Sequence, residues 1–492
     1  MRIFTRRFLI FSQALIFLLV GFAHVPLQPT PVDFSAIDRY VLIQMEAANI
    51  PGAGLAIVHD GRVVHTAGYG IADSGGTPVT SGTLFILGST SKGITALAVM
   101  QLVAQEKLDL DMPVQIYLPW FSLADSYAAS QITPRMLLNQ TSGLGYNDGT
   151  RPLYDRPGEY TLEERVRQMS TLPVYRTPGA SFEYSNYNYM VLGAVVEAIS
   201  GQPYKDYVRE NIFSPLGMED SAASLEDDVS LNLADPYRWW FGFPVPVNAP
   251  YPKDAVPAGF IIASADDMSK YLAFQQSGSP GILPSELLNS MHTSCVSSGD
   301  EVEYCYGWVR GKFGGADALF HEGSAQGYYS VIAMEPEGGW GLVVLTNANQ
   351  MLSAPANGIA ATVFSHLVNA SPLAISHNFR WLYAGIDFIV IALTSFMFFS
   401  ILRLPRWKMK LLTRGPNGFF GWVGRIGLPV LAELIVPFLV WIFLPQGAGF
   451  PMWKVMGIFQ PDLTIWLFLI AGLFVLRGFL RICVVVQYIA EK

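Results

Sequence analysis

The chain of 492 residues is 51% hydrophobic and only 14% charged, which indicates membrane segments beside a globular part. Its formal net charge is −8. The basic residues gather near both ends, so the middle of the chain is strongly acidic, and an acidic domain argues against nucleic-acid binding.

Residues 1–23 have the pattern of a secretory signal peptide. Three arginines precede an apolar run that ends at Ala23, and this run is short for a membrane-spanning helix. An uncleaved N-terminal anchor is the alternative, and either interpretation places the following residues outside the cytoplasm. Residues 24–33 are rich in proline and predict a linker.

Residues 34–372 predict one α+β domain. Helical periodicity covers 34–48, and Asp60-Gly61 between two alternating runs is a strong β-hairpin signal. An apolar helix begins near Ser89, and residues 130–290 are predicted to be mostly helical. Later strands are predicted at 306–310, 318–321, 328–335 and 340–347, before a helix at 356–368. Strands from both ends of the domain, with helices between them, favour an antiparallel sheet flanked by helices.

Three apolar stretches in the C-terminal part predict membrane-spanning helices, at 381–402, 426–444 and 463–480. The loop between the first two is rich in Lys and Arg, which predicts a cytoplasmic loop and a cytoplasmic C-terminus. The domain before the helices is then extracytoplasmic, in agreement with the N-terminal signal. Glu433 lies deep in the second stretch, and it is predicted to be protonated inside the bundle or paired with Arg477.

The three cysteines leave the disulfide question open. Cys295 and Cys305 lie ten residues apart in the external domain and could pair across a hairpin, but spacing alone does not decide this. Cys483 follows the last apolar stretch. No His/Cys cluster has metal-ligand spacing and no glycine-rich phosphate loop is present, so no metal or cofactor is predicted.

A first motif, Ser89-Thr-Ser-Lys92, lies where a strand-like segment meets an apolar helix. Residues three apart on a helix share a face, so the Ser89 hydroxyl would lie beside the Lys92 amine. A buried lysine has a lowered pKa and can act as a base for a serine nucleophile. Taken alone, the motif is more typical of a helix start with a capping serine and a solvated lysine.

Two further motifs have functional interpretations. Tyr184-Ser-Asn186 lies in a loop that enters a helix, where Tyr184 could relay a proton and Asn186 could hold a substrate carbonyl. His321-Glu-Gly323 lies on a strand edge, where Gly323 would let a substrate approach the backbone and the N–H of Ser324 could bind an oxyanion. Each motif alone is more typical of a helix cap or a turn.

Together the three motifs, in this order and at spacings of about 95 and 137 residues, resemble the serine β-lactamase and D,D-peptidase superfamily, specifically its class C-like branch of penicillin-recognising enzymes and esterases. The resemblance covers roughly residues 35–370. It extends to segments outside the motifs: Ile50–Val58, Leu108–Val114, Ile132–Leu144, Pro215–Met218, Ala258–Asp267 and Tyr306–Trp308.

The resemblance implies an acyl-enzyme on Ser89, with Lys92 as general base and Tyr184 as proton relay. His321 takes the place of a lysine in the lactamases' third motif, and the N–H groups of Ser89 and Ser324 would form the oxyanion hole. Asn186 and Gly323 would contact substrate.

This sequence departs from the family's pattern at three places, and the first two narrow the range of expected substrates. A histidine in that third motif favours a D,D-peptidase, D-aminopeptidase or esterase over an efficient β-lactamase. Glu322 stands where a threonine would bind a substrate carboxylate, which it would repel. Asn139-Gln140 replaces a more usual Thr-His.

The sequence therefore predicts a membrane-anchored extracytoplasmic serine hydrolase that acts on a small molecule or peptide with an amide or ester bond. The alternative is a penicillin-binding or sensor protein that acylates without rapid turnover.

Overall fold

The computed structural model describes residues 32–150, 153, 158–225, 232–336, 339–350, 354–370, 379–447 and 452–491. The predicted signal segment and nearly all of the linker lie outside these residues. The chain divides into two compact units, Met1–Arg39 and Tyr40–Lys492. The first contributes the beginning of helix α2 (Phe34–Ala48), and the sheet, the candidate site and the C-terminal helices lie in the second.

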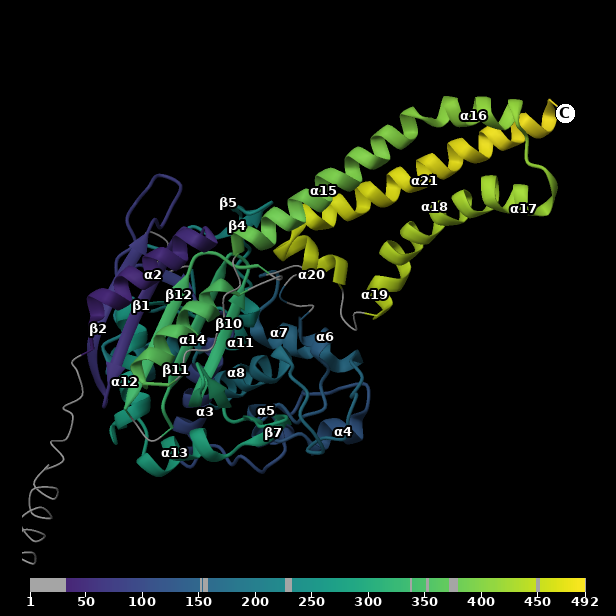
Figure 1. Ribbon diagram of the computed structural model, residues 1–492. Helices are drawn as coiled ribbons and strands as arrows, with labels where there is room; N and C mark the ends of the chain where they lie inside the picture. Colours follow the sequence, from purple (N-terminus) through teal and green to yellow (C-terminus); the bar gives the residue numbers. More distant parts are fainter. Residues whose placement is uncertain are drawn as a thin grey trace, which may run out of the picture. The chain divides into compact units, whose positions relative to one another are not determined.

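The framework of the second unit is an eight-stranded antiparallel sheet with the order β2-β1-β12-β11-β10-β9-β8-β7 (Figure 1). Strands from both ends of the domain form its centre, as predicted. The strands are β1 (Gly52–His59), β2 (Arg62–Gly70), β7 (Val296–Gly299), β8 (Val302–Tyr304), β9 (Val309–Phe313), β10 (Ala316–Ala325), β11 (Tyr328–Met334) and β12 (Trp340–Thr346).

The β1–β2 hairpin turns at Asp60-Gly61, as the sequence predicts. Both residues have positive φ, 50° and 70°, the backbone that a two-residue hairpin turn with the right twist requires. Two small antiparallel pairs complete the strands: β3 (Leu84–Ile86) with β6 (Ile262–Ser264), and β4 (Tyr237–Trp240) with β5 (Phe243–Pro246).

Helices cover both faces of the sheet. Helix α12 (Ala265–Ser277) packs on β1, β2 and β12, whereas α14 (Pro355–Leu367) packs on β9, β11 and β12. The other helices of this domain are α3 (Ser91–Ala104), α4 (Ser126–Gln131), α5 (Pro134–Leu138), α6 (Tyr146–Thr150), α7 (Leu162–Arg167), α8 (Asn186–Ser200), α9 (Tyr204–Val208), α10 (Ser214–Leu216), α11 (Val256–Gly259) and α13 (Ser285–Thr293). This arrangement confirms the α+β prediction.

Helix α3 is the central helix of the domain. Its residues from Ser91 to Leu102 are all buried, and it packs against α8, α11 and α13. A helix that is apolar on nearly every side is stable only in such a position, which explains the mostly hydrophobic run after Lys92. The same packing removes Lys92 from water.

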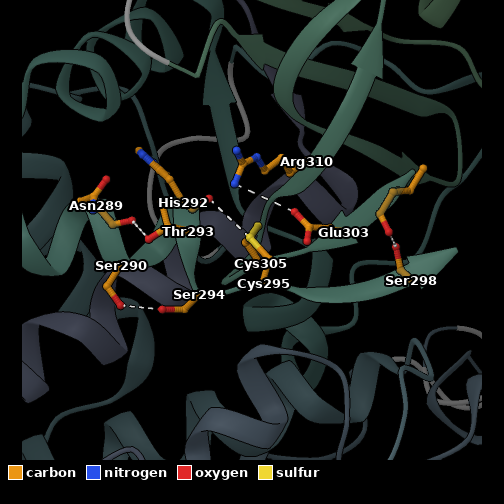
Figure 2. Close-up of a disulfide and its surroundings, with 11 residues drawn as sticks. Asn289, Ser290, His292, Thr293, Ser294, Cys295, Ser298, Glu303, Cys305 and Arg310 are labelled. Atoms are coloured by element: carbon orange, nitrogen blue, oxygen red, sulfur yellow. Dashed lines mark hydrogen bonds and ion pairs between the residues drawn. A yellow bond between two sulfur atoms is a disulfide. The ribbon is translucent and has the colours of Figure 1, made fainter. Parts of the chain in front are cut away.

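A disulfide joins Cys295 and Cys305, so the open question of their pairing is answered (Figure 2). Cys295 follows α13 and Cys305 follows β8, so the bond fixes the end of a helix to the β7–β8 hairpin. The bond closes a short loop next to Tyr304, which lines the candidate site described below.

Replacing both cysteines by alanine should lower the free energy of unfolding by about 3 kcal/mol, because the unfolded chain regains the entropy of a short closed loop. Denaturant unfolding of the full chain in detergent, followed by the fluorescence of the domain, measures this change. An unchanged transition midpoint in the double variant would contradict the prediction.

Three C-terminal helical segments are long and apolar enough to cross a membrane: Phe379–Leu402, Gly418–Phe443 and Pro461–Ala490. They comprise α15 (Phe379–Leu402), a helical run through α17 (Gly418–Trp422) and α18 (Leu428–Phe438), and α21 (Pro461–Ala490). Shorter helices α16 (Leu404–Thr413), α19 (Leu444–Gly447) and α20 (Met452–Phe459) accompany them.

Candidate active site

Ser89 lies in a tight turn that is pressed against the sheet. The turn η1 (Gly88–Thr90) follows β3 and leads directly into α3. Gly88 has a φ of 58°, and a Cβ on it would lie 2.4 Å from the amide nitrogen of Ser324 on β10. Only glycine fits this backbone and this approach. The turn holds Ser89 half-exposed beside the strand that carries the His321 motif.

Gly323 provides the matching space on β10. A Cβ there would lie 1.9 Å from the Leu87 carbonyl oxygen and 2.3 Å from Ser330 Oγ. The missing side chain of Gly323 accommodates the Leu87–Gly88 backbone, and the approach of a substrate to Gly323 stays a prediction. Gly323 thus positions the serine turn.

Lys92 is completely buried one helical turn after Ser89. Its Nζ lies 3.0 Å from Ser89 Oγ, 2.8 Å from Asn186 Oδ1 and 2.6 Å from the carbonyl oxygen of Ala258. Among the described residues no carboxylate forms an ion pair with it. Burial without a counter-charge lowers the pKa of Lys92 well below its usual value.

The hydrogen-bond partners of Lys92 fit the neutral amine. A neutral amine has two N–H donors and one lone pair, whereas the amide oxygen of Asn186 and the carbonyl of Ala258 can only accept. These two acceptors use both N–H groups. The lone pair is then directed to the Ser89 hydroxyl, which is the arrangement of a general base with its nucleophile.

Tyr184 contacts the serine from the other side. Its hydroxyl donates to Ser89 Oγ at 2.9 Å, and Lys92 Nζ lies 4.9 Å from the centre of its ring. Burial raises the pKa of Tyr184 well above its usual value, so it is a neutral hydroxyl at physiological pH. A neutral phenol can pass a proton onward, which fits a relay role beside Ser89.

The loop that carries Tyr184 is held by Gln140. Its side-chain oxygen accepts from the backbone N–H of Ser185 at 2.9 Å and from the side-chain amide of Asn188. Because Ser185 lies between Tyr184 and Asn186, Gln140 sets the position of both. This contact gives a structural reason for the glutamine that the sequence analysis left unexplained.

His321 lies on β10, buried and close to Lys92. Its Nδ1 lies 2.7 Å from the Glu322 carbonyl, which can only accept, so Nδ1 carries the proton and Nε2 is an acceptor. Burial, together with the neighbouring Lys92 amine, lowers the pKa of His321 to about 4. At neutral pH His321 is therefore uncharged, and its Nε2 faces the Tyr304 hydroxyl as a hydrogen-bond acceptor.

We expect His321→Gln to reduce kcat/KM by about tenfold, the value of one lost hydrogen bond of about 1.4 kcal/mol. The shape of the pH profile between about 5 and 8 should not change, because His321 titrates below this range. Loss of an ionisation near pH 6 to 7 in the variant would contradict this assignment.

Tyr304 is a site residue that sequence analysis missed. Its hydroxyl lies 3.4 Å from His321 Nε2, and its ring contacts the ring of Tyr184 edge-on at 6.1 Å. Burial raises the pKa of Tyr304, so it is a neutral donor to the histidine. Its place next to Cys305 gave no signal, because the sequence leaves the pairing of that cysteine open.

Glu322 and Ser324 point to the opposite face of β10, because side chains alternate along a strand. Glu322 accepts from Tyr329 at 2.6 Å and from Asn357 of α14. Its predicted repulsion of a substrate carboxylate is therefore wrong. The Ser324 hydroxyl accepts from Asn349 at 2.7 Å, which leaves only the backbone N–H of Ser324 for the predicted oxyanion role.

The structure thus brings Ser89, Lys92, Tyr184 and Asn186 into one hydrogen-bonded group, with His321 beside it. The described residues contain no group of three or more His, Cys, Asp or Glu that could hold a metal ion. A serine in a turn at the head of a buried helix, next to an antiparallel sheet, agrees with the fold that the resemblance to the serine β-lactamase and D,D-peptidase superfamily implies.

The chain belongs to the Beta-lactamase family, whose profile matches residues 37–363. It is similar to Protein flp of Staphylococcus aureus strain N315, with 26% identity over 317 residues, 64% of this chain and 63% of that protein. The match thus spans less than two thirds of that relative.

Solved structures agree with the family. The octameric penicillin-binding protein homologue from Pyrococcus abyssi is 28% identical, with a TM-score of 0.60 over 69% of this chain and 78% of that chain. The D-amino acid amidase from Ochrobactrum anthropi SV3 is 25% identical, with a TM-score of 0.59 over 69% of this chain and 99% of that chain.

Proposed function

We propose that this chain is a membrane-anchored serine hydrolase that forms an acyl-enzyme on Ser89 and acts outside the cytoplasm on an amide or ester. The observation that carries the proposal is the Lys92 amine, buried without a carboxylate and 3.0 Å from Ser89 Oγ. A buried, uncompensated lysine is costly, and its use as a base explains why it is there.

The proposed reaction has two steps. Lys92 Nζ takes the Ser89 proton as Oγ attacks the substrate carbonyl, and the N–H groups of Ser89 and Ser324 stabilise the oxyanion. Tyr184 passes a proton to the leaving group, which departs and leaves the acyl group on Ser89. Water then attacks the ester, with its proton taken through the same groups, and the acid product is released.

Asn186 is proposed to hold the substrate. Its Oδ1 accepts from Lys92, which leaves the Nδ2 hydrogens as donors for a carbonyl of the acyl part. One side chain would then orient both the base and the substrate.

The charges at the site favour substrates without a carboxylate near the scissile bond. His321 is neutral at physiological pH, and Lys92 is neutral when it serves as the base. A carboxylate in the site would lose its hydration without gaining a cationic partner. The similarity to a D-amino acid amidase supports an amide substrate.

A matched pair of substrates tests this proposal. The full chain in detergent is assayed with an N-acyl-D-Ala-D-Ala peptide whose C-terminus is either amidated or free. We expect kcat/KM to be at least about tenfold higher for the amide, since a buried unpaired charge costs more than about 1.4 kcal/mol. Faster cleavage of the free acid would contradict the proposed preference for substrates without a carboxylate. If no amide or ester were cleaved, the proposal that this chain is a hydrolase would be contradicted.

One observation favours the second candidate, a sensor that acylates slowly. Tyr383 of α15 donates to Gln350 at 2.6 Å, and the adjacent Asn349 donates to Ser324 at 2.7 Å. A C-terminal helix is thereby connected to the strand beside Ser89. A deacylation half-life of hours would favour the sensor, whereas turnover within seconds would favour the hydrolase.

A further inference from the structure

The C-terminal helices contain an ionic cluster with an excess of positive charge. Arg477 Nε lies 2.8 Å from both carboxylate oxygens of Glu433, and Arg481 lies 3.1 Å from one of them. The pairing of Glu433 with Arg477 was one of the two predicted alternatives. Two guanidinium groups share one carboxylate, so the cluster retains a positive charge among apolar helices.

A pocket of about 380 Å³ opens next to this cluster, between α15, α16 and α21. Its lining is partly cationic and partly aromatic. The residues are Phe396, Phe399, Ser400, Arg403, Leu404, Trp407 and Arg481. Arg403 and Arg481 are its charged members, and neither faces a carboxylate within the pocket lining.

Arg481 is only partly satisfied by Glu433. Its guanidinium lies over the Trp407 ring at 5.5 Å from the ring centre. Its Nε is buried and, among the described residues, has no hydrogen-bond partner. A buried donor on a charged group without a partner is costly, and an anion in the pocket would remove this cost.

Arg403 has no side-chain ion pair within the described part of the chain and is exposed at the rim of the pocket. It precedes α16, whose sequence Leu-Pro-Arg-Trp-Lys-Met-Lys-Leu-Leu-Thr alternates basic and apolar residues. Short basic amphipathic helices beside a membrane span attract anionic lipid headgroups. The pocket therefore lies where a headgroup region would be expected.

The pocket is far from the catalytic serine. Phe379, at the start of α15, packs against Trp239 of the catalytic domain at 5.3 Å between ring centres. Ser400 lies 21 residues further along the same helix, which is about 30 Å of helix axis. This length is about the thickness of the hydrocarbon core, so the pocket lies at the opposite membrane boundary.

We propose that this pocket binds the phosphate of an anionic phospholipid in the leaflet opposite the catalytic domain. Arg403 and Arg481 hold the phosphate oxygens, Trp407 flanks the headgroup, and the acyl chains lie along the exposed apolar face near Phe396 and Phe399. Guanidinium groups suit this ligand because they bind phosphate through two hydrogen bonds. The site does not depend on the proposed hydrolase activity.

Native mass spectrometry of the full chain tests this proposal. The protein is released from detergent with equal amounts of phosphatidylglycerol and phosphatidylcholine that have identical acyl chains. Both lipids carry the phosphate, but only phosphatidylcholine adds a quaternary ammonium that the two arginines repel, so we expect phosphatidylglycerol to be retained about tenfold more. Equal retention of the two lipids would overturn the proposal.

Two arginines three residues apart provide a matched comparison. Arg403→Gln should reduce the preference for phosphatidylglycerol at least fivefold, whereas Arg406→Gln, an exposed arginine outside the pocket lining, should leave it unchanged. Arg403 is preferred to Arg481 because it does not contact Glu433, so its replacement leaves the buried ion pair intact. Equal effects of both variants would indicate general charge attraction and overturn the specific site.

Inorganic phosphate distinguishes a lipid from a soluble anion. Millimolar phosphate should not displace the bound phosphatidylglycerol, because the acyl chains contribute to its binding. Displacement by phosphate would show that the pocket binds a soluble anion, and it would overturn the proposal that a phospholipid binds there.

Discussion

Replacement of Ser89 by alanine should abolish hydrolysis, with a loss in kcat/KM for an activated ester of at least about 10³-fold. The alanine removes the hydroxyl that both Lys92 and Tyr184 contact, at 3.0 and 2.9 Å. The protein should remain folded, because Ser89 is half-exposed and the turn is held by Gly88 and its neighbours.

Ser277→Ala is the matched control for this variant. Ser277 is exposed at the end of α12, and its hydroxyl bonds only to the carbonyl of Ala273 among the described residues. It should retain full activity. If Ser89→Ala retained more than about a tenth of the wild-type rate, Ser89 would not be the nucleophile.

Lys92→Arg should be as damaging as Lys92→Met, with a loss of about 10²- to 10⁴-fold in kcat/KM, the usual contribution of a general base. Methionine removes the base but fills the same space. Arginine keeps a positive charge but never loses its proton at physiological pH, so it cannot accept one from Ser89. Activity that survives in Lys92→Arg would show that only the charge is needed.

The pH dependence of kcat/KM tests the same role of Lys92 as general base. The deprotonated amine is the active form, so kcat/KM should rise with pH as Lys92 loses its proton. Because burial lowers the pKa of Lys92 well below its usual value of 10.5, this rise should be complete long before that pH. Lys312→Met, which removes an exposed lysine paired with Asp317, is the control that should keep the wild-type profile.

Sequence patterns predicted the parts of this fold that depend on local geometry. The Asp60-Gly61 hairpin follows from the positive φ that this turn needs, and the three-residue spacing of Ser89 and Lys92 follows from the helical repeat. The membrane-spanning candidates follow from length and apolar composition. Each of these signals depends only on residues that are close together in the sequence.

Contacts between distant segments could not be predicted in the same way. Tyr304 meets His321 and Tyr184 because β8 lies two strands from β10 and the disulfide fixes its end, and no local pattern contains that information. The direction of Glu322 depends on which face of β10 packs on α14. The strand periodicity gives the alternation but not the choice of face.

The charge state of His321 also could not be predicted from the sequence. A histidine in the sequence could carry either charge state, and its position in the motif suggested a substitute for a lysine. Burial next to Lys92 lowers its pKa to about 4, which favours the uncharged imidazole at neutral pH, and this burial cannot be read from the sequence.

The most direct test is the mass of the intact full chain after incubation with penicillin and, separately, with a fluorophosphonate, followed by peptide mapping. The proposed mechanism predicts one covalent adduct with at least one probe, located on Ser89 and absent from Ser89→Ala. No adduct with either probe on a folded protein, or an adduct on another residue, would contradict an activated Ser89 nucleophile.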